Sequence, residues 1–149
     1  MLVSSFKFFV KPLIAASLLI FAYAGSVQAD DLEFTANEAE FESLFNGKDL
    51  TDWTNNGNWE VHDGVITRSG KGGDLVYQAM PIPNDFELRF DWKVASGSNS
   101  GVYYRPGQYE YQILDNQVHR DGKNPRTSAA SLYFCMQPSH DATKPVGEW

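Results

Sequence analysis

The feature that most constrains the fold is a segment with a strict period of two, "DFELRFDWKVA", residues 85–95. Its apolar residues are Phe86, Leu88, Phe90, Trp92 and Val94, and the charged residues between them are Glu87, Arg89, Asp91 and Lys93. Because successive side chains of a strand point to opposite faces, the segment predicts a strand with one buried and one wet face. Sheets covered on one side only are typically antiparallel. We therefore predict an all-β, antiparallel sandwich or jelly roll.

The neighbouring segments also read as short strands separated by turn residues. In "NWEVHDGVITRS" the dipeptide Asp63-Gly64 separates two alternating runs, which predicts a hairpin. A further short strand is expected in "DLVYQA", residues 74–79, which Pro81 and Pro83 follow. The pattern indicates one aromatic-rich β domain.

A second hairpin is expected in "SNSGVYYRPGQYEYQILDN", residues 98–116. If Pro106-Gly107 closes it, Tyr104 pairs with Tyr109 and the two faces separate cleanly. One face carries Val102, Tyr104, Tyr109, Tyr111 and Ile113, and the other carries Asn99, Tyr103, Arg105, Glu110 and Gln112. The second set suits a sugar, whose ring stacks on aromatic side chains while its hydroxyls form hydrogen bonds. The alternative is an ordinary ion pair between Arg105 and Glu110 on a solvated face.

Residues 1–29 have the pattern of a signal peptide. Lys7 and Lys11 precede an apolar run over residues 13–24, and Val27-x-Ala29 resembles a signal-peptidase site, with cleavage before Asp30. An uncleaved anchor is the alternative, but the run is shorter than the roughly 20 residues that span a membrane. We expect an exported protein, periplasmic or secreted, with no membrane span after cleavage.

Charge and cysteine content exclude several classes of function. Without residues 1–29 the chain has ten basic and nineteen acidic residues, a net charge of −9. This charge argues against nucleic acid or an anionic membrane as partner. Cys135 is the single cysteine, so an internal disulfide is excluded, and we interpret it as a small hydrophobic residue and not a nucleophile.

Six motifs in series resemble the 3-keto-disaccharide hydrolase domain family, which was long catalogued as a domain of unknown function. They are "FESLFNGKDLTDW", "NWEVHDGVI", "DFELRFDWKV", "NSGVYYR", "YEYQILD" and "KPVGEW". The resemblance implies a concanavalin-like sandwich over residues 41–149, with residues 30–40 as a lead-in, exported by bacteria and acting on 3-keto-glycosides. More strands follow Gly-Glu-Trp in that family, so we expect a C-terminally truncated member whose sandwich is incomplete.

The segment "YEYQILD" has the spacing of a known catalytic motif. Laminarinase-type glucanases of similar fold place Glu-x-Asp-x-x-Glu on the face of the cleft, and Glu110, Gln112 and Asp115 have this spacing here. The middle acid is an amide, so the chemistry is not a simple copy. Regular alternation would point Asp115 into the core, whereas a bulge near Leu114 would return it to the Glu110 face.

A ketone at carbon 3 acidifies the hydrogen on carbon 2, so the glycosidic bond can break by elimination through an enolate, followed by addition of water. We expect Glu110 to act as base or acid and the always protonated Arg105 to stabilise the enolate. Direct hydrolysis by two carboxylates is the other route. The expected catalytic residues are Arg105, Glu110, Gln112 and Asp115, and the expected substrate-binding residues are Tyr103, Asn99, Trp53 and His119.

No cofactor is certain from the sequence. Oxygen and nitrogen donors gather near Glu110 and His119, so a divalent metal stays open, but their spacing matches no known ligand pattern. A non-catalytic carbohydrate-binding module on the same scaffold is the alternative function, with Tyr103, Trp53 and Arg105 holding a glycan.

Overall fold

The computed structural model describes residues 5–12, 41–105 and 107–149, in which every strand pairing is antiparallel. The strands are β1 (Ser5–Pro12), β2 (Glu42–Ser43), β3 (Trp53–Asn55), β4 (Trp59–His62), β5 (Val65–Arg68), β6 (Leu75–Tyr77), β7 (Phe86–Lys93), β8 (Asn99–Tyr104) and β9 (Tyr109–Leu114). A 3-10 turn, Arg120–Lys123, follows β9. The predicted all-β, antiparallel class is confirmed.

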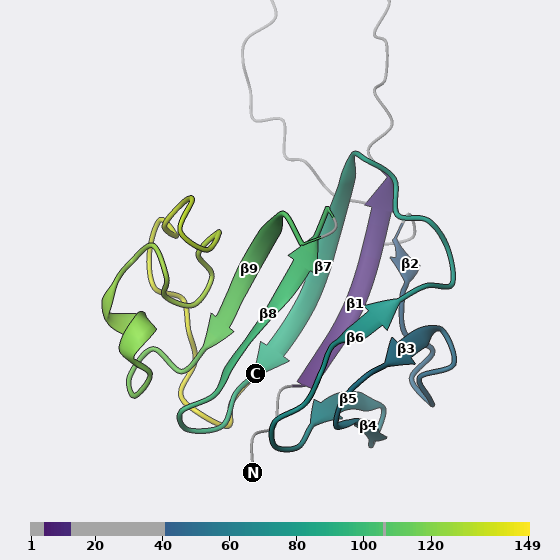
Figure 1. Cartoon of the computed structure of the whole chain (residues 1–149), viewed down its shortest axis with the longest axis horizontal. Coiled ribbons are helices and arrows are strands. Elements are labelled where there is room, and N and C mark those ends of the chain that lie inside the picture. The colour runs from purple at the N-terminus through teal and green to yellow at the C-terminus, as the bar shows by residue number, and fades with distance from the viewer. Residues whose placement is uncertain (1–4, 13–40, 106) are drawn as a thin grey trace, which may run out of the picture.

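The strands form one five-stranded sheet and two two-stranded sheets. The large sheet has the order β2-β1-β5-β4, and β7 pairs with β1 along its other edge. The pair β8-β9 forms a second layer, and β3 pairs with β6. Figure 1 shows β1, in purple, lying beside β7.

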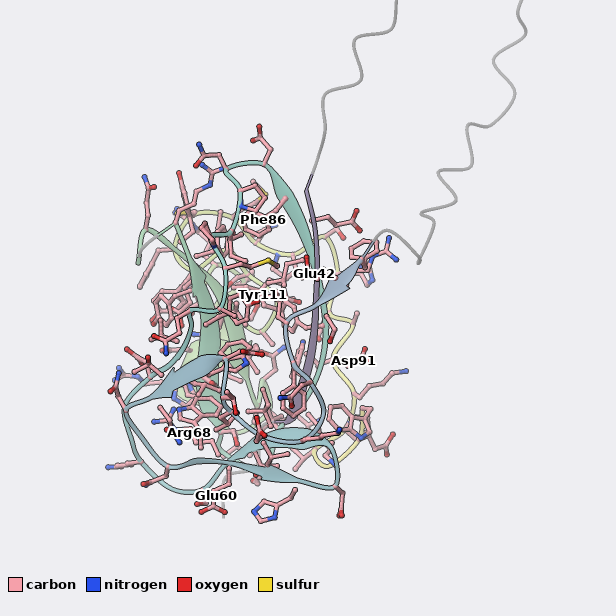
Figure 2. All side chains as sticks on the ribbon, turned by 90° about the vertical axis from the view of Figure 1, so that its right-hand side faces the viewer. Glu42, Glu60, Arg68, Phe86, Asp91 and Tyr111 are labelled. Atoms are coloured by element: carbon pink, nitrogen blue, oxygen red, sulfur yellow. The ribbon has the colours of Figure 1, made fainter. Side chains whose placement is uncertain are left out.

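The two layers pack through aromatic side chains. Phe86 meets Tyr104 edge-to-face with ring centroids 6.1 Å apart, and Phe90 meets Tyr111 in the same way at 5.2 Å. In Figure 2, Phe86 and Tyr111 lie between the layers, whereas Asp91 points outward. This is the interior of a β-sandwich.

The predicted face of β7 is confirmed. Val94 belongs to the buried core, and the other four apolar residues of the segment pack against that core. The core residues are Leu44, Phe45, Ile66, Val94 and Ile113. On the opposite face Asp91 is exposed, and the Nε of Arg89 lies 2.8 Å from a carboxylate oxygen of Glu87.

The hairpin β4-β5 forms as its turn dipeptide predicts. Asp63 and Gly64 both have positive φ, 51° and 72°, as a type I′ turn requires. The register runs from His62 opposite Val65 to Trp59 opposite Arg68. This register places Trp59 and Arg68 side by side at the far end of the hairpin.

The register of β8-β9 is also as predicted. Tyr104 pairs with Tyr109, Tyr103 with Glu110, and the ladder continues without an extra residue to the pair of Asn99 and Leu114. The N–H of Gln108 donates to the carbonyl of Arg105 at 3.0 Å and closes the turn. Since no bulge interrupts the described ladder, Asp115 keeps the parity of Tyr111 and Ile113 and does not return to the Glu110 face.

The N-terminal strand has no counterpart in the sequence analysis. Ser5–Pro12 forms β1, although the sequence assigns this segment to a signal peptide. The expected cleavage site before Asp30 and the lead-in 30–40 lie outside the described residues. The signal peptide therefore stays a prediction. Within the described ranges, no helix is long and apolar enough to cross a membrane.

Candidate active site

A cleft of about 1050 Å³ follows strand β8. One wall includes Asn99, Gly101, Tyr103, Arg105 and Glu110 from β8 and β9 or the turn between them, and the opposite wall includes Trp53, Trp59, Arg68, Asp74 and Tyr77. Its floor is the apolar interior of the sandwich, where Phe86 and Leu88 of β7 line it. The cleft is large enough for a small organic ligand, because such sites usually measure about 300–1,000 Å³.

Glu110 and Tyr103 form the centre of the β8-β9 wall. They are directly opposite in the ladder, and the Tyr103 hydroxyl is hydrogen-bonded to the Glu110 carboxylate. Burial raises the pKa of Glu110 above its usual range, while the hydrogen bond from Tyr103 partly offsets this effect. Partial burial, the hydrogen bond to Glu110 and the charge of Glu110 raise the pKa of Tyr103 to about 12. A carboxylate with a raised pKa is suited to accept a proton near neutral pH.

Gly101 makes room for the Glu110 carboxylate. A Cβ atom at position 101 would overlap the carboxylate, whose Oε1 is the nearest atom. Glu110 therefore lies across the strand against the backbone of Gly101, and only glycine leaves this space open. The sequence "NSG" thus has a specific role in the site that alternation alone does not reveal.

Arg105 lies at the rim of the cleft. Its φ of +51° takes it out of the strand geometry, so its side chain does not follow the β8 alternation. The side chain is exposed, and Nη2 donates to the carbonyl of Asn84 at 2.7 Å. Arg105 and Glu110 therefore line the same cleft, and no ion pair between them is seen among the described contacts.

Gln112 does not line the cleft. Its side chain is only 2% exposed, and its Oε1 accepts a hydrogen bond from the N–H of Ile113 at 3.0 Å. Its backbone N–H donates to the carbonyl of Ser131, and its carbonyl accepts from Ala130. These backbone bonds hold the segment around residue 131 against β9, so the contacts of Gln112 are those of a residue that stabilises the fold.

Asp115 is likewise buried, at 3% exposed, and its carboxylate binds backbone groups. Oδ2 accepts from the N–H of Gly97 at 2.9 Å, and Oδ1 accepts from the N–H of Gln117 at 3.0 Å. The bond from Gly97 is the main reason that the pKa of Asp115 lies below its usual value. Asp115 joins the loop before β8 to the loop after β9 and lies outside the cleft.

Asn99 lines the cleft and contacts His119, which is not among the residues that line it. The Nδ2 of Asn99 is 3.4 Å from the Nε2 of His119. His119 caps the 3-10 turn, because its Nδ1 accepts from the N–H of Asp121 at 3.2 Å. This contact makes His119 a candidate for positioning Asn99.

Trp53 lines the opposite wall, as expected of a substrate-binding residue, but its ring is held from two sides. Its Nε1 donates to the carbonyl of Leu44 at 3.1 Å, and its ring meets the ring of Tyr77 edge-to-face with centroids 5.0 Å apart.

Arg68 also lines this wall, and the sequence analysis did not predict it. The guanidinium of Arg68 lies over the ring of Trp59, 5.3 Å from its centroid, and the register of the Asp63-Gly64 hairpin could have paired these two residues.

Tyr133 is a second residue that the sequence analysis missed. Its backbone N–H donates to the carbonyl of Glu110 at 2.9 Å, and its hydroxyl is hydrogen-bonded to Asp121. Burial, with the negative charges of Asp121 and Glu110, raises the pKa of Tyr133. No local pattern places this residue beside Glu110, since it lies in an irregular segment more than twenty residues along the chain.

The described residues offer no group of ligands for a metal centre. Within the described ranges, no three His, Cys, Asp or Glu side chains are grouped so that they could hold a metal ion. The donors expected near Glu110 are separated, because Asp115 and Gln112 are buried elsewhere and His119 is occupied at Nδ1.

Comparison with known proteins gives two matches. Residues 40–149 match the profile of the 3-keto-α-glucoside-1,2-lyase-like domain. A "3-keto-disaccharide hydrolase" of Bacteroides thetaiotaomicron is 30% identical over 175 aligned positions, which cover 91% of this chain and 60% of that protein. The chain thus spans about 60% of the length of this relative. No solved structure matches the chain.

Proposed function

The chain belongs to the 3-keto-α-glucoside-1,2-lyase-like domain family, and we propose that it takes part in cleaving glycosides whose glucose unit carries a ketone at carbon 3. The family resemblance drawn from the six sequence motifs is confirmed by the profile match and by the relative. The substrate class is carried over from the names of that family and that relative. We also propose that the β-sandwich has the concanavalin-like fold that the family resemblance implies.

The observation that carries the proposal is the Glu110–Tyr103 pair in the cleft. The carboxylate is partly buried against Gly101, has a raised pKa and faces a space of ligand size. A group of this kind can remove a proton from a carbon acid, since its basicity is higher than that of an exposed carboxylate. The hydroxyl of Tyr103 fixes the direction of the carboxylate.

The proposed reaction is an elimination followed by addition of water. Glu110 takes the hydrogen on carbon 2 as a proton, and the electron pair of that bond moves onto the ketone oxygen as an enolate. The enolate re-forms the ketone and a double bond between carbons 1 and 2, while the bond from carbon 1 to the glycosidic oxygen breaks. That oxygen takes a proton and leaves as an alcohol. Water then adds its oxygen to carbon 1 and its hydrogen to carbon 2.

Arg105 is the proposed electrophilic group for the enolate oxygen. It is always charged and stands at the rim of the cleft, where its bond to Asn84 occupies one end of the guanidinium. Asn99 on the same wall, and Trp53 opposite, are proposed to contact the sugar hydroxyls and ring. Gln112 and Asp115 are not given a chemical role, because both are buried outside the cleft.

Direct displacement is the competing route, and it needs a second carboxylate across the scissile bond. Asp74 on the opposite wall is the residue of the cleft lining that offers one. The route predicts that Asp74→Asn is as damaging as a change at Glu110. Elimination predicts a much smaller loss for Asp74→Asn, because no step of it uses this carboxylate.

The test is Glu110→Gln, assayed on the full-length protein with a 3-keto-glycoside. We expect kcat to fall about 100- to 10,000-fold with a smaller change in KM, because the amide keeps the shape but cannot accept the proton. Glu60→Gln is the matched control, since Glu60 is exposed and lies on the outer hairpin (Figure 2). Full turnover by Glu110→Gln would reject Glu110 as the base.

Turnover in heavy water separates the two routes. Elimination requires that the product carry deuterium on carbon 2, at a rate above the exchange of the substrate without enzyme. Product without deuterium at carbon 2 would rule out the enolate route. It would leave direct displacement as the reaction.

A carbohydrate-binding module is the second candidate function, and the aromatic lining of the cleft favours it. Trp53, Trp59, Tyr77 and Tyr103 all line the space, and such residues hold sugar rings without any chemistry. If the module alone is correct, Glu110→Gln and Tyr103→Phe change the affinity for a glycan, and no aglycone is released by any variant or by the unchanged protein.

We also propose that the protein is exported, on the pattern of residues 1–29. N-terminal sequencing of the protein recovered outside the cytoplasm should start at Asp30. A start at Met1, or far from Asp30, would contradict the proposed processing.

A further inference from the structure

The proposed elimination requires a proton donor for the departing glycosidic oxygen. When the bond from carbon 1 breaks, this oxygen must take a proton, because a free alkoxide ion is strongly basic and leaves slowly. Tyr103 lines the cleft, and its hydroxyl is hydrogen-bonded to the carboxylate of Glu110, the proposed base. This contact places an O–H group beside the atoms that receive the hydrogen of carbon 2.

The strand ladder fixes the hydroxyl of Tyr103 relative to the base. Tyr103 stands directly opposite Glu110 and two residues from Gly101, so the three residues share one face of the hairpin. Gly101 leaves room for the carboxylate, whose Oε1 is the atom nearest to a Cβ placed at that position. The carboxylate therefore lies over Gly101, where the hydroxyl of Tyr103 binds it. One short hairpin thus supplies both the base and the hydroxyl group.

The charge of Glu110 controls how readily Tyr103 gives up its proton. Partial burial, then the hydrogen bond and the charge of Glu110, and then the charge of Asp74 raise the pKa of Tyr103 to about 12. Tyr103 is therefore protonated at neutral pH, as a proton donor must be. Once Glu110 has taken the proton from carbon 2, its negative charge is gone, and the pKa of Tyr103 falls by the part that this charge causes. The tyrosine becomes a stronger acid at the step that needs one.

We propose that Tyr103 is the catalytic acid that protonates the departing glycosidic oxygen, an assignment that rests on the proposed function. In the resting pair the hydroxyl of Tyr103 donates to the carboxylate of Glu110. When Glu110 holds the proton from carbon 2, its own O–H donates to the oxygen of Tyr103. The hydroxyl of Tyr103 then turns towards the glycosidic oxygen in the cleft.

The proton balance closes within this pair. Tyr103 gives its proton to the glycosidic oxygen as the electron pair of the bond from carbon 1 moves onto that oxygen. The tyrosinate takes the proton of Glu110, which restores the carboxylate and the phenol together. For the addition of water the pair works in reverse. Water loses a proton to Tyr103 as its oxygen bonds to carbon 1, Tyr103 passes its own proton to Glu110, and Glu110 delivers a proton to carbon 2.

The experiment varies the basicity of the departing oxygen and uses the full-length protein. Two 3-keto-glucosides of the same anomeric configuration are compared, of which one releases methanol and the other 4-nitrophenol. Methoxide needs a proton to leave, whereas 4-nitrophenolate leaves without one. We expect Tyr103→Phe to lower kcat/KM about 100- to 10,000-fold for the methyl glycoside, because a general acid is removed. The loss for the nitrophenyl glycoside should be at least ~10-fold smaller.

Tyr109→Phe is the matched control. Tyr109 belongs to the same hairpin, its ring stacks on that of Tyr104 with centroids 5.8 Å apart, and it is not among the residues that line the cleft. This variant should cleave both glycosides at nearly the rate of the unchanged protein.

A second variant keeps the hydroxyl. Replacement of Tyr103 by 3-fluorotyrosine lowers the pKa of the phenol but preserves its proton, so cleavage of the methyl glycoside should be retained. Loss of that cleavage in the fluorinated protein, with the nitrophenyl glycoside still cleaved, would contradict the proposal. Turnover of the nitrophenyl glycoside by Tyr103→Phe also shows that this variant is folded.

Equal losses for the two glycosides in Tyr103→Phe would overturn the proposal, because a tyrosine that only orients Glu110 affects removal of the carbon-2 hydrogen from both. Full cleavage of the methyl glycoside by Tyr103→Phe would overturn it as well. The proposed function is tested separately by Glu110→Gln, which should lose both substrates. If the unchanged protein cleaves neither glycoside, the proposed function is rejected, and the role of Tyr103 falls with it.

Discussion

The hairpin β8-β9 and the pair β7-β1 are both regular antiparallel ladders, but they differ in how far apart their strands lie in the chain. The hairpin joins Tyr104 to Tyr109 across one short turn. The other ladder joins Phe8 to Phe90, which are separated by most of the chain. The hairpin carries the partly buried Glu110 of the cleft, whereas β7 contributes its apolar floor.

The difference shows which strand pairings are determined by residues close together in the sequence. In the hairpin, one turn sets the register and the alternation sets the faces, so both follow from a single short segment. For β7 the alternation sets the faces alone, and nothing within residues 85–95 identifies the partner strand. Pairing across a long loop is decided by the sum of contacts over the whole sandwich.

The largest expected effects test whether the two ladders share one core. Ile113 of β9 and Ile66 of β5 are both fully buried, at 0% exposed. Ile113→Ala and Ile66→Ala should each lower the free energy of unfolding by about 2–5 kcal/mol, because each leaves a cavity in the same core. Ile82→Ala, at an exposed position, is the control.

Chemical denaturation followed by fluorescence and by far-ultraviolet circular dichroism measures these losses. Coincident transitions in both variants would indicate that the layers unfold together. A loss for Ile66→Ala without one for Ile113→Ala would show that the hairpin layer is independent of the large sheet.

The next effect concerns the end of the hairpin. Asp115→Asn should lower the free energy of unfolding by about 1.5–3 kcal/mol at neutral pH. The amide keeps one acceptor oxygen, now uncharged, and its NH2 group cannot accept from the second of the two N–H groups. The pKa of Asp115 is lowered in the folded state. Its contribution is therefore present above the ordinary aspartate pKa of about 4 and is lost as the pH falls through the lower folded value.

Urea denaturation at several pH values checks this prediction. The difference between the unchanged protein and Asp115→Asn should shrink on acidification. Asp91→Asn on the exposed face of β7 is the matched control and should change the stability by less than about 0.5 kcal/mol at any pH. An Asp115 effect that does not depend on pH would contradict the assigned charge state.

Gly101→Ala sharpens the role of the hairpin in the site. The added methyl group overlaps the Glu110 carboxylate, so the carboxylate must move or the strands must separate, at about 1–3 kcal/mol. We expect a loss of activity larger than the loss of stability, because the proposed base is displaced. Ser100→Ala, at the neighbouring position of β8, is the control, and equal activity in both variants would contradict the arrangement.

The smallest expected effect is a gain in stability from Glu110→Gln. Burial raises the pKa of Glu110 in the folded state, so its contribution is full below the ordinary glutamate pKa and is lost as the pH rises through the folded value. At neutral pH the charged carboxylate therefore destabilises the fold slightly, and the amide removes this cost. Thermal unfolding at pH 5 and pH 8 tests it, and a gain that is larger at pH 5 would be the wrong sign.

The local features of this protein were determined by its sequence. The strict alternation in residues 85–95 defined the faces of β7, and the Asp63-Gly64 and Pro106-Gly107 turns defined two registers, so the pairing of Tyr103 with Glu110 was predictable. The six motifs defined the family. The physical reason is that turn conformation and side-chain alternation depend on residues that are neighbours in the chain.

Only the tertiary structure decided which polar residues reach the cleft. The alternation placed Gln112 with Glu110, yet the segment around Ser131 covers Gln112 and buries it. Asp115 looked like a catalytic acid by spacing, but the N–H groups of Gly97 and Gln117 enclose its carboxylate. Tyr133 and Arg68 entered the surroundings of the site from distant segments, and Ser5–Pro12 completed the sheet. These outcomes depend on burial and on hydrogen-bond partners far along the chain, which no local pattern encodes.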